Sequence, residues 1–401
     1  MKPLRKSLGF GVLVLYGIGT TVGAGIYALV GEIVAVAGNL APWSFLVASA
    51  MAGLTALSFA ELSGRYPRAA GTALYVENGF GSVALARTVG LLVVLSGVVS
   101  SAALVNGMTG YAQVFVDAPV ALIIVCVIVV LSLVALWGIE QSAWTAGVIS
   151  VIEVGGLIWI ASLSVNHTEW SSVSWADYLP DGSATLPILA GAVLSFYAYI
   201  GFEDMVEVAE EVRDVRRVLP RAILTTLVVT SVIYVLLLGA VLLAVGPDFL
   251  AGADAPLAAV HERLAGGQGW VLGVIALLAI VNGALIQIIM ASRVVYGLAS
   301  RGQLPSQLAY VHPRLRTPLV ATLLVALVIC VLALTGRLAV LAEMTSAIML
   351  TVFALANLAL WRIKSSQSVV EGVMHIPRWL PLLGFVVCSY FVVHTLIGWL
   401  A

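Results

Sequence analysis

The chain has 401 residues, of which 61% are hydrophobic and 10% are charged, and its formal net charge is −1. Soluble domains are roughly 45–50% apolar and about 25% charged, so the surplus apolar surface of this chain must face lipid. The composition therefore excludes a water-soluble protein. Without a basic tail or a low-complexity run, it also argues against nucleic-acid binding.

The residues that usually hold metals or cofactors do not form a recognisable pattern. Cys126, Cys330 and Cys388 lie inside apolar runs, and the five histidines are scattered without the spacing of metal ligands. Neither an HExxH sequence nor a phosphate-binding P-loop occurs. We therefore expect no metal and no cofactor, and this argues against an enzyme.

Apolar runs of about 20 residues, the length that crosses a bilayer, occur eleven times along the chain. No long polar linker separates them, so we predict an all-α integral membrane protein with one transmembrane domain over residues 1–401. The predicted spans are Gly9–Gly31, Pro42–Ala60, Thr88–Val116, Ala118–Ile139, Gln141–Leu163, Leu186–Phe202, Ala222–Pro247, Gly269–Ser292, Thr317–Gly336, Leu338–Trp361 and Trp379–Ala401.

The basic residues fix the orientation of these spans. With the N-terminus in the cytoplasm, only Arg263 and Arg337 fall in outer loops, and the other basic residues lie inside. We therefore predict a multi-pass protein of the plasma (inner) membrane, with a cytoplasmic N-terminus and an external Ala401. The longest outer loops are residues 166–183 and 248–267, and the second is expected to contain a short surface helix around Pro256–Leu264.

The first span is unusual because four glycines, Gly17, Gly19, Gly23 and Gly25, lie within nine residues. Each glycine costs a helix about 0.5–1 kcal/mol relative to alanine, so a local opening is favoured here. Unwound backbone in a membrane is tolerated only where it lines a protein cavity. The alternative is that Gly19 and Gly23 form a GxxxG pair that only allows close helix packing.

The sixth span favours the cavity interpretation. Its charge-free run Leu186–Phe202 is short, a break is expected at Gly201, and acidic residues follow from Glu203 onward. Glu203, Glu207 and Glu211 are spaced to lie on one helical face, which must point into protein or water. Two interrupted helices five spans apart indicate an inverted repeat with a central binding site. We expect repeat one over about 9–163, repeat two over about 186–361, and an extra helix at 379–401.

Two other glutamates lie within or beside apolar runs. Glu61 lies near the cytoplasmic end of its span and is expected to pair with Arg65. Glu153 lies in the middle of a span without other charge, so it must be protonated, paired or exposed to a cavity. Because desolvation penalises an ionised carboxyl, we expect Glu153 to bind and release a proton during function.

Four motifs in order give the chain a resemblance to a known family. They are Gly17–Tyr27, Glu61–Pro67, Tyr197–Glu203 with Ala209–Glu211, and Ala299–Pro305. The chain resembles the amino acid–polyamine–organocation (APC) superfamily of permeases over nearly its whole length. This resemblance implies the LeuT fold, a 5+5 inverted repeat with discontinuous helices 1 and 6.

The resemblance also implies a substrate site. In relatives, backbone amides at the first break hold the substrate carboxylate, and carbonyls at both breaks accept its amino group. The matching positions are Val22, Gly23, Ala24 and Gly25 in the first span and Tyr197, Ala198, Ile200 and Gly201 in the sixth. Ser96, Ser100 and Gln287 are the candidates for the side-chain pocket.

The chain departs from the resemblance in two ways. Many relatives have twelve spans, and this chain has eleven predicted ones. Many sodium-independent relatives carry a lysine in the fifth span, and aligning Gly138–Ala143 with their motif places Glu153 at that position. Because the charge is reversed, the coupling of those relatives cannot simply be carried over. The candidate coupling residues are the buried Glu153 and, beside the second break, Glu203, with a proton favoured over a sodium ion.

These features predict a secondary active transporter of amino acids, with a neutral L-amino acid favoured because the third span shows no acidic residue in its middle. Transport would proceed by alternating access, as a proton-coupled carrier or an exchanger. The alternatives are an amine or polyamine permease and a transporter-like sensor or channel. The expected partners are the amino acid, membrane lipid and H⁺.

Overall fold

The computed structural model describes residues 8–68, 71–137, 143–267, 269–300, 302, 304–315, 317–367 and 370–400. Within these ranges the chain is helical and contains no β-strand, only one isolated bridge between Leu8 and Val212. The predicted cytoplasmic residues 1–6 and the predicted external Ala401 lie outside the described residues. Arg301 and Gln303 of the last motif lie outside them too, as does most of the Gly138–Ala143 motif.

The described helices follow the predicted spans. Among the described residues, nine segments are long and apolar enough to cross a membrane, and two shorter apolar helices, Phe10–Val22 and Leu319–Thr335, also lie in predicted spans. The helices are α1 Phe10–Val22, α2 Ala24–Ala37, α3 Ala41–Arg65, α4 Gly71–Phe80, α5 Val83–Gln113, α6 Val120–Trp137, α7 Ala143–His167, α8 Thr185–Tyr197, α9 Val215–Val245, α10 Pro247–Ala251, α11 Pro256–Ala265, α12 Trp270–Ser300, α13 Leu319–Thr335, α14 Leu338–Ser366 and α15 Trp379–Leu400.

Several helices extend beyond their predicted apolar runs. For example, α9 begins at Val215 and includes three arginines before the apolar run starts. Backbone hydrogen bonds continue a helix past the lipid boundary, whereas hydropathy marks only the part inside lipid. The surface helix α11 confirms the helix predicted around Pro256–Leu264. The short helix α4 was not predicted; it is too short to span a bilayer and buries Tyr75 and Val76.

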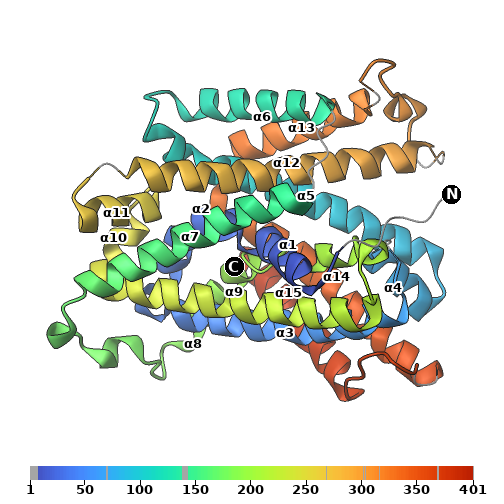
Figure 1. Ribbon diagram of the computed structural model, residues 1–401, viewed down its shortest axis with the longest axis horizontal. Coiled ribbons are helices and arrows are strands. Elements are labelled where there is room, and N and C mark those ends of the chain that lie inside the picture. The colour runs from blue at the N-terminus through green and yellow to red at the C-terminus, as the bar shows by residue number, and fades with distance from the viewer. Residues whose placement is uncertain are drawn as a thin grey trace.

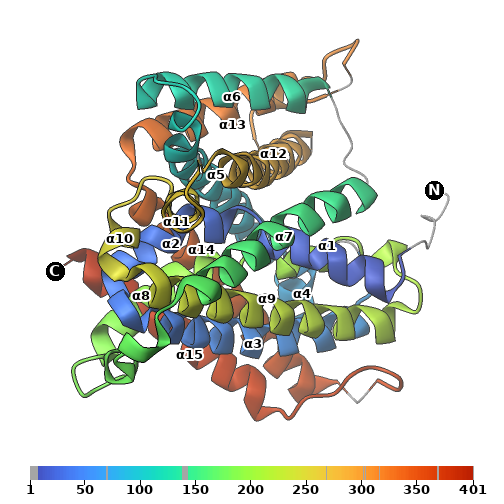
Figure 2. The same ribbon diagram turned by 60° about the vertical axis from the view of Figure 1, so that its left-hand side comes forward.

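The helices form two packed groups. In one, α1 packs on α9 and α7, and α3 packs on α8 and α9 (Figure 1). In the other, α5 packs on α12, and α6 and α13 lie together at the edge of the bundle far from α15 (Figure 2). The two groups meet in the middle, where α2 contacts α12 and α5. Many apolar side chains remain exposed on the outer helices, as expected for a surface that faces lipid.

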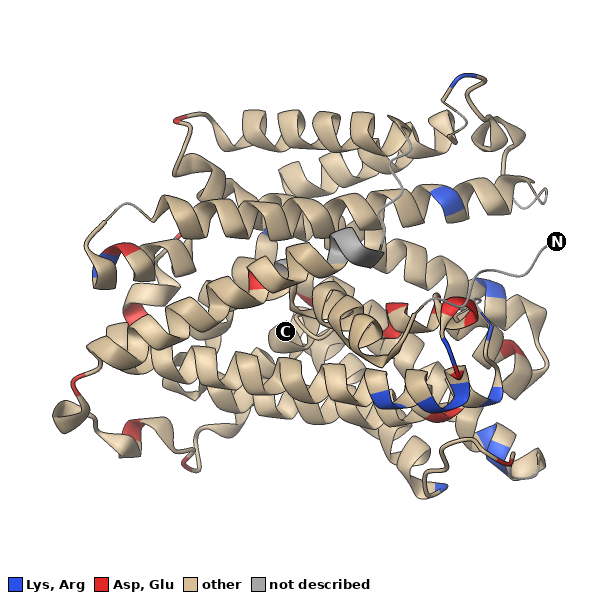
Figure 3. Ribbon diagram, in the orientation of Figure 1, with Lys and Arg blue, Asp and Glu red and all other residues tan. Residues whose placement is uncertain are grey.

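Charge is concentrated at one end of the bundle. Most lysines and arginines lie at the end where the described chain begins (Figure 3). At this end Glu61 is completely buried and accepts hydrogen bonds from Arg65 at 2.8 Å and Lys364 at 2.7 Å. The Ile376 backbone amide also donates to it at 3.0 Å, and the His375 ring nitrogen Nδ1 lies 3.2 Å away. The predicted Glu61–Arg65 pair is confirmed, as part of a larger cluster.

Candidate substrate site

The first predicted break is present. Helix α1 ends at Val22 and α2 begins at Ala24, and Gly23 between them has φ −48° and ψ −124°, outside the helical region. The last carbonyls of α1 and the first amides of α2 therefore lack helical partners. The amides at the start of α2 carry the positive end of a helix dipole, which favours a bound carboxylate.

The second break lies directly against the first. Helix α8 ends at Tyr197, four residues before the predicted break at Gly201, and a 3-10 turn follows at Phe202–Val206. Gly201 has φ +127°, and a Cβ at this position would collide with the carbonyl of Thr20. The Thr20 hydroxyl donates to the Gly201 carbonyl at 3.0 Å. Glycine is therefore required here by both the backbone conformation and the close approach.

Tyr234 of α9 joins the ends of the two broken helices. Its hydroxyl lies 3.0 Å from the Thr21 carbonyl and 3.0 Å from the Ala198 carbonyl, and the side chain is completely buried. The Tyr234 hydroxyl thus lies within hydrogen-bond distance of a backbone carbonyl from each helix end, and neither carbonyl has a helical donor. The sequence analysis did not identify Tyr234. The available signal was a hydroxyl-bearing aromatic residue inside an otherwise apolar span, which needs a buried partner.

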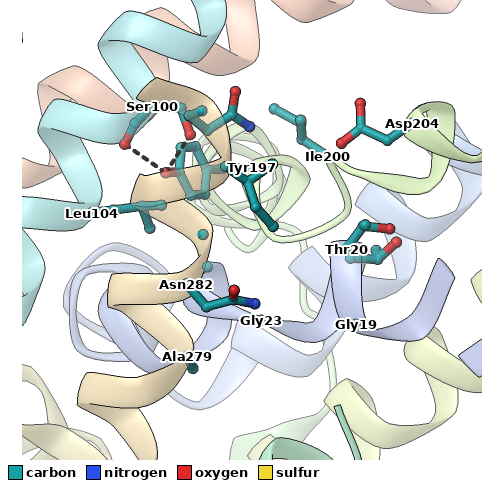
Figure 4. A pocket seen from close by; sticks show the side chains of 15 residues that line it. Gly19, Thr20, Gly23, Ser100, Leu104, Tyr197, Ile200, Asp204, Ala279 and Asn282 are labelled. Carbon is teal, nitrogen blue, oxygen red and sulfur yellow. Dashed lines mark hydrogen bonds between the residues drawn. The ribbon is translucent and has the colours of Figure 1, made fainter. Parts of the chain in front are cut away.

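A cavity of about 60 Å³ lies beside the two breaks (Figure 4). This volume exceeds the roughly 10–15 Å³ that one water needs. Gly19 and Thr20 border it from α1, Gly23 borders it from the first break, and Ile200 and Asp204 border it from the second break. The opposite wall comes from α5 and α12, where Ser100, Leu104, Ala279 and Asn282 lie in Figure 4. The cavity therefore combines exposed helix ends with side chains of both polar and apolar character.

Six of the predicted site residues border this cavity: Gly23, Gly25, Ser100, Tyr197, Ile200 and Gln287. The Ser100 and Tyr197 hydroxyls are 2.9 Å apart, which fixes the Tyr197 ring on the wall. The Gln287 amide oxygen is buried and has no hydrogen-bond partner among the described residues. An unpaired buried acceptor is costly, so this amide is placed to receive a donor from a bound molecule.

Four of the other predicted residues, Val22, Ala198, Gly201 and Ser96, do not line the cavity. Val22 and Ala198 are buried in the core, and Ala24 is the first residue of α2. Gly201 contacts Thr20 instead of the cavity. Ser96 is buried on α5 and does not line the cavity. These residues shape the backbone around the site.

Glu203 turns back onto its own backbone. Its Oε2 atom accepts a hydrogen bond from the Gly201 amide at 2.8 Å, and only 9% of the residue is exposed. The expectation that Glu203, Glu207 and Glu211 share one helical face is wrong. After Gly201 the chain forms 3-10 turns at Phe202–Val206 and Ala209–Glu211, not a continuous helix, so spacing by four does not align these side chains.

Asp204 is a site residue that the sequence analysis did not single out. It borders the cavity close to Thr20 and Ile200 and brings a carboxyl group to the site (Figure 4). The signal was its place directly after Glu203 at the predicted break. Asp204 was missed because a continuous helix was assumed, and a spacing of four residues selects Glu203, Glu207 and Glu211 instead.

Glu153 of α7 lies beside the first break. The residue is 1% exposed, and neither carboxyl oxygen has a hydrogen-bond partner among the described residues. One of its oxygens lies 3.7 Å from the position that a Cβ on Gly23 would occupy. The Tyr27 hydroxyl donates to the Glu153 backbone carbonyl at 2.7 Å, which ties α7 to α2. The Glu153 carboxyl group therefore lies next to Gly23 without lining the cavity.

The described residues contain no cluster of three or more histidine, cysteine or acidic side chains that could hold a metal ion. Cys126, Cys330 and Cys388 are free thiols. The groups that the described residues bring to the site are helix ends, amides, hydroxyls and carboxyl groups. Such groups can bind a small zwitterion, and the carboxyl groups among them can bind protons.

Comparison with known proteins identifies relatives over the whole chain. A family model described as amino acid permease matches residues 8–400. An uncharacterized transporter of Mycobacterium tuberculosis is 31% identical over 392 residues, which cover 96% of this chain and 85% of the relative. The branched-chain amino acid permease BcaP of Bacillus subtilis is 26% identical, covering 99% and 89%. A vacuolar cationic amino acid transporter of Arabidopsis thaliana is 28% identical, covering 86% and 60%.

Proposed function

This chain belongs to the amino acid permease family and is a multi-pass membrane transporter of amino acids, not an enzyme; we propose that it carries a neutral L-amino acid by alternating access. The observation that carries the proposal is the contact between the two broken helices beside a cavity. In inverted-repeat transporters, substrates bind where half-helix ends meet.

The proposed pose follows from the electrostatics of the helix ends. The substrate carboxylate lies at the first amides of α2, at Ala24 and Gly25, where the helix dipole favours an anion. The substrate ammonium lies towards Asp204 and the carbonyls of the second break. The side chain then points towards α5 and α12, between Leu104 and Gln287.

The lining of the cavity favours an aliphatic side chain. Leu104, Ala279 and Ile286 offer apolar surface on the side-chain wall. The relative named as a branched-chain amino acid permease fits this preference.

A second candidate substrate class is a cationic amino acid or an amine. Asp204 places a carboxyl at the cavity, and several relatives are named as cationic amino acid transporters. In this alternative Asp204 would pair with the distal charge of the substrate instead of its α-ammonium.

Binding to the purified protein tests the substrate class. We expect leucine, valine or alanine to raise the unfolding temperature and to compete with each other, whereas arginine and putrescine do not. Binding of arginine or putrescine alone would reject the neutral class. Concentrative uptake into proteoliposomes would exclude a channel, and binding without any uptake or exchange would indicate a sensor.

We further propose that transport is coupled to protons through Glu153. Its carboxyl is buried beside Gly23 without a partner among the described residues, so binding a proton there affects the backbone that holds the substrate. Glu203 is the other candidate, although its carboxylate already caps the Gly201 amide. Sodium at Glu153 is the alternative ion.

The proposed architecture has repeat one over about 9–163, repeat two over about 186–361 and an extra helix at 379–401. This division would give each of the two broken helices the corresponding place in its repeat. The group of α1, α2, α3, α8 and α9 would rock against α5, α6, α12 and α13. The arginine-rich end would lie in the cytoplasm of a plasma-membrane protein. An alkaline phosphatase fusion after residue 401 should then be active, and a fluorescent protein fused there should be dark.

A further inference from the structure

A second pocket lies at the arginine-rich end of the bundle, away from the central cavity. It forms where the end of α3, the end of α14 and the segment before α15 meet. Its volume is about 220 Å³, compared with about 60 Å³ for the central cavity. Four of its lining residues have basic side chains: Arg65, Lys364, His375 and Arg378.

The pocket contains more positive charge than its carboxylate can neutralise. Glu61 lies at its base and pairs with Arg65 at 2.8 Å and with Lys364 at 2.7 Å. Among the described residues, Glu61 is the carboxylate that forms ion pairs with this group. Arg65, Lys364 and Arg378 carry three positive charges against the one negative charge of Glu61, so two positive charges remain even with His375 neutral.

Burial makes this excess costly. The Lys364 side chain is 5% exposed, so water screens its charge poorly. A lysine ammonium has three donors, and the two Glu61 oxygens account for two of them. An anion that enters the pocket would offset the remaining charge. Phosphate oxygens suit it, because arginine and lysine together bind phosphate through charge-assisted hydrogen bonds.

The surroundings of the pocket match the interface of a membrane. The Arg378 guanidinium lies 5.2 Å from the centre of the Trp361 ring and donates to the Ser365 hydroxyl. Helix α15 starts at the next residue, Trp379, which is 61% exposed. Large apolar side chains of α15 are exposed further along, as expected for a helix against acyl chains. Basic pockets beside interfacial tryptophans are where anionic head groups bind.

We propose that this pocket binds a phosphate group, supplied by the head group of an anionic phospholipid or by free phosphate. The ligand joins α3, α14 and the start of α15 by neutralising Lys364 and Arg378. This site is separate from the amino-acid site, so its test does not depend on substrate binding or transport.

The test uses the purified full chain with phosphatidylglycerol, phosphatidylcholine or inorganic phosphate as the probe. Retained lipid is measured by native mass spectrometry, and stabilisation is measured by the unfolding temperature. We expect retention of phosphatidylglycerol over phosphatidylcholine. Arg378→Gln should weaken this binding at least about tenfold, since it removes a charge-assisted contact.

Arg362→Gln is the matched control. Arg362 lies at the same end of α14, and its substitution removes the same charge as Arg378→Gln. Its side chain, however, packs over Phe80, donates to the Gly79 carbonyl and does not line the pocket. Its binding should stay within about twofold of the wild type, because long-range attraction at this surface is screened. Lys364→Gln is the second pocket variant, and it should weaken binding as Arg378→Gln does.

The lipid and inorganic-phosphate measurements distinguish a lipid head group from free phosphate as the source of the bound phosphate group. Stabilisation by millimolar inorganic phosphate, lost in Arg378→Gln, would support a free-phosphate ligand, and lipid retention unaffected by phosphate would support the head group. Equal retention of both lipids together with no effect of phosphate would overturn the proposal. Equal losses in Arg378→Gln and Arg362→Gln would overturn it too, since attraction would then be a property of the surface charge alone.

Discussion

Two buried glutamates, Glu61 and Glu153, have opposite surroundings. Glu61 is 0% exposed and has partners from α3, α14 and the segment before α15. Glu153 is 1% exposed, and its two carboxyl oxygens have no hydrogen-bond partner among the described residues. Burial of a carboxyl is costly in both places, but only Glu61 regains the cost locally. The difference separates a glutamate that holds helices together from one that is available to a proton or an ion.

The largest effect on stability is expected for Glu61→Gln. The amide cannot balance Arg65 and Lys364, and breaking a buried ion pair from one side costs about 3–5 kcal/mol. Thermal unfolding in detergent measures this loss. Glu77→Gln on the exposed face of α4 is the control and should change stability by less than about 0.5 kcal/mol. Equal stability of Glu61→Gln and wild type would remove the structural role of the cluster.

The largest effect on substrate binding is expected for Gly201→Leu. A side chain at φ +127° is strained, and it would collide with Thr20 where the two breaks meet. We expect at least about a 100-fold loss of amino acid affinity, equivalent to roughly 2.7 kcal/mol. Gly25→Leu should act in the same way, because its Cβ would lie 3.0 Å from the Cα of Ala198.

Gly239→Leu on α9 is the matched control for both glycine variants. A Cβ at Gly239 meets nothing within 4 Å, so this variant should bind normally. All three proteins must elute as single species for the comparison to hold. Normal amino acid affinity in Gly201→Leu would mean that the glycines only allow close helix packing, as in the GxxxG interpretation.

A smaller effect is expected for Asp204→Asn. If Asp204 faces the α-ammonium, loss of its charge should weaken binding of every amino acid by about tenfold, in line with one charge-assisted hydrogen bond. Competition binding with leucine and arginine measures this. A loss confined to arginine would instead support the cationic alternative.

The smallest effect on stability is expected for Glu153→Gln. Because the carboxyl has no hydrogen-bond partner among the described residues, a neutral amide of the same size should change stability by less than about 1 kcal/mol. The unfolding temperature of this variant should stay close to that of the wild type. A loss as large as that of Glu61→Gln would mean that the two glutamates do not differ.

The sequence was sufficient for the features that are local in the chain. Hydropathy located the spans, glycine spacing located the first break, and a separation of four residues predicted the Glu61–Arg65 pair. Contacts between distant segments were not predictable. Lys364 and Ile376 reach Glu61 from about 300 residues away, and Tyr234 reaches Thr21 and Ala198 only after folding.

Asp204 was missed for a different reason. A helical period was assumed where Gly201 starts a series of 3-10 turns, so the acidic residues were assigned to the wrong faces. The burial of Glu153 was predictable because an isolated carboxyl in an apolar run has few options. Its place behind Gly23 depended on the packing of α7 against α1, which no local pattern encodes.

Amino acid accumulation by reconstituted protein under an imposed pH gradient tests the central claim most directly. Wild type, Glu153→Gln and Glu203→Gln are compared, with a sodium gradient as the second condition. The account predicts that the wild type concentrates a neutral amino acid with the pH gradient, that Glu153→Gln still exchanges it without concentrating it, and that Glu203→Gln still concentrates it. Proton-driven accumulation by Glu153→Gln, or accumulation by the wild type with sodium alone, would contradict it.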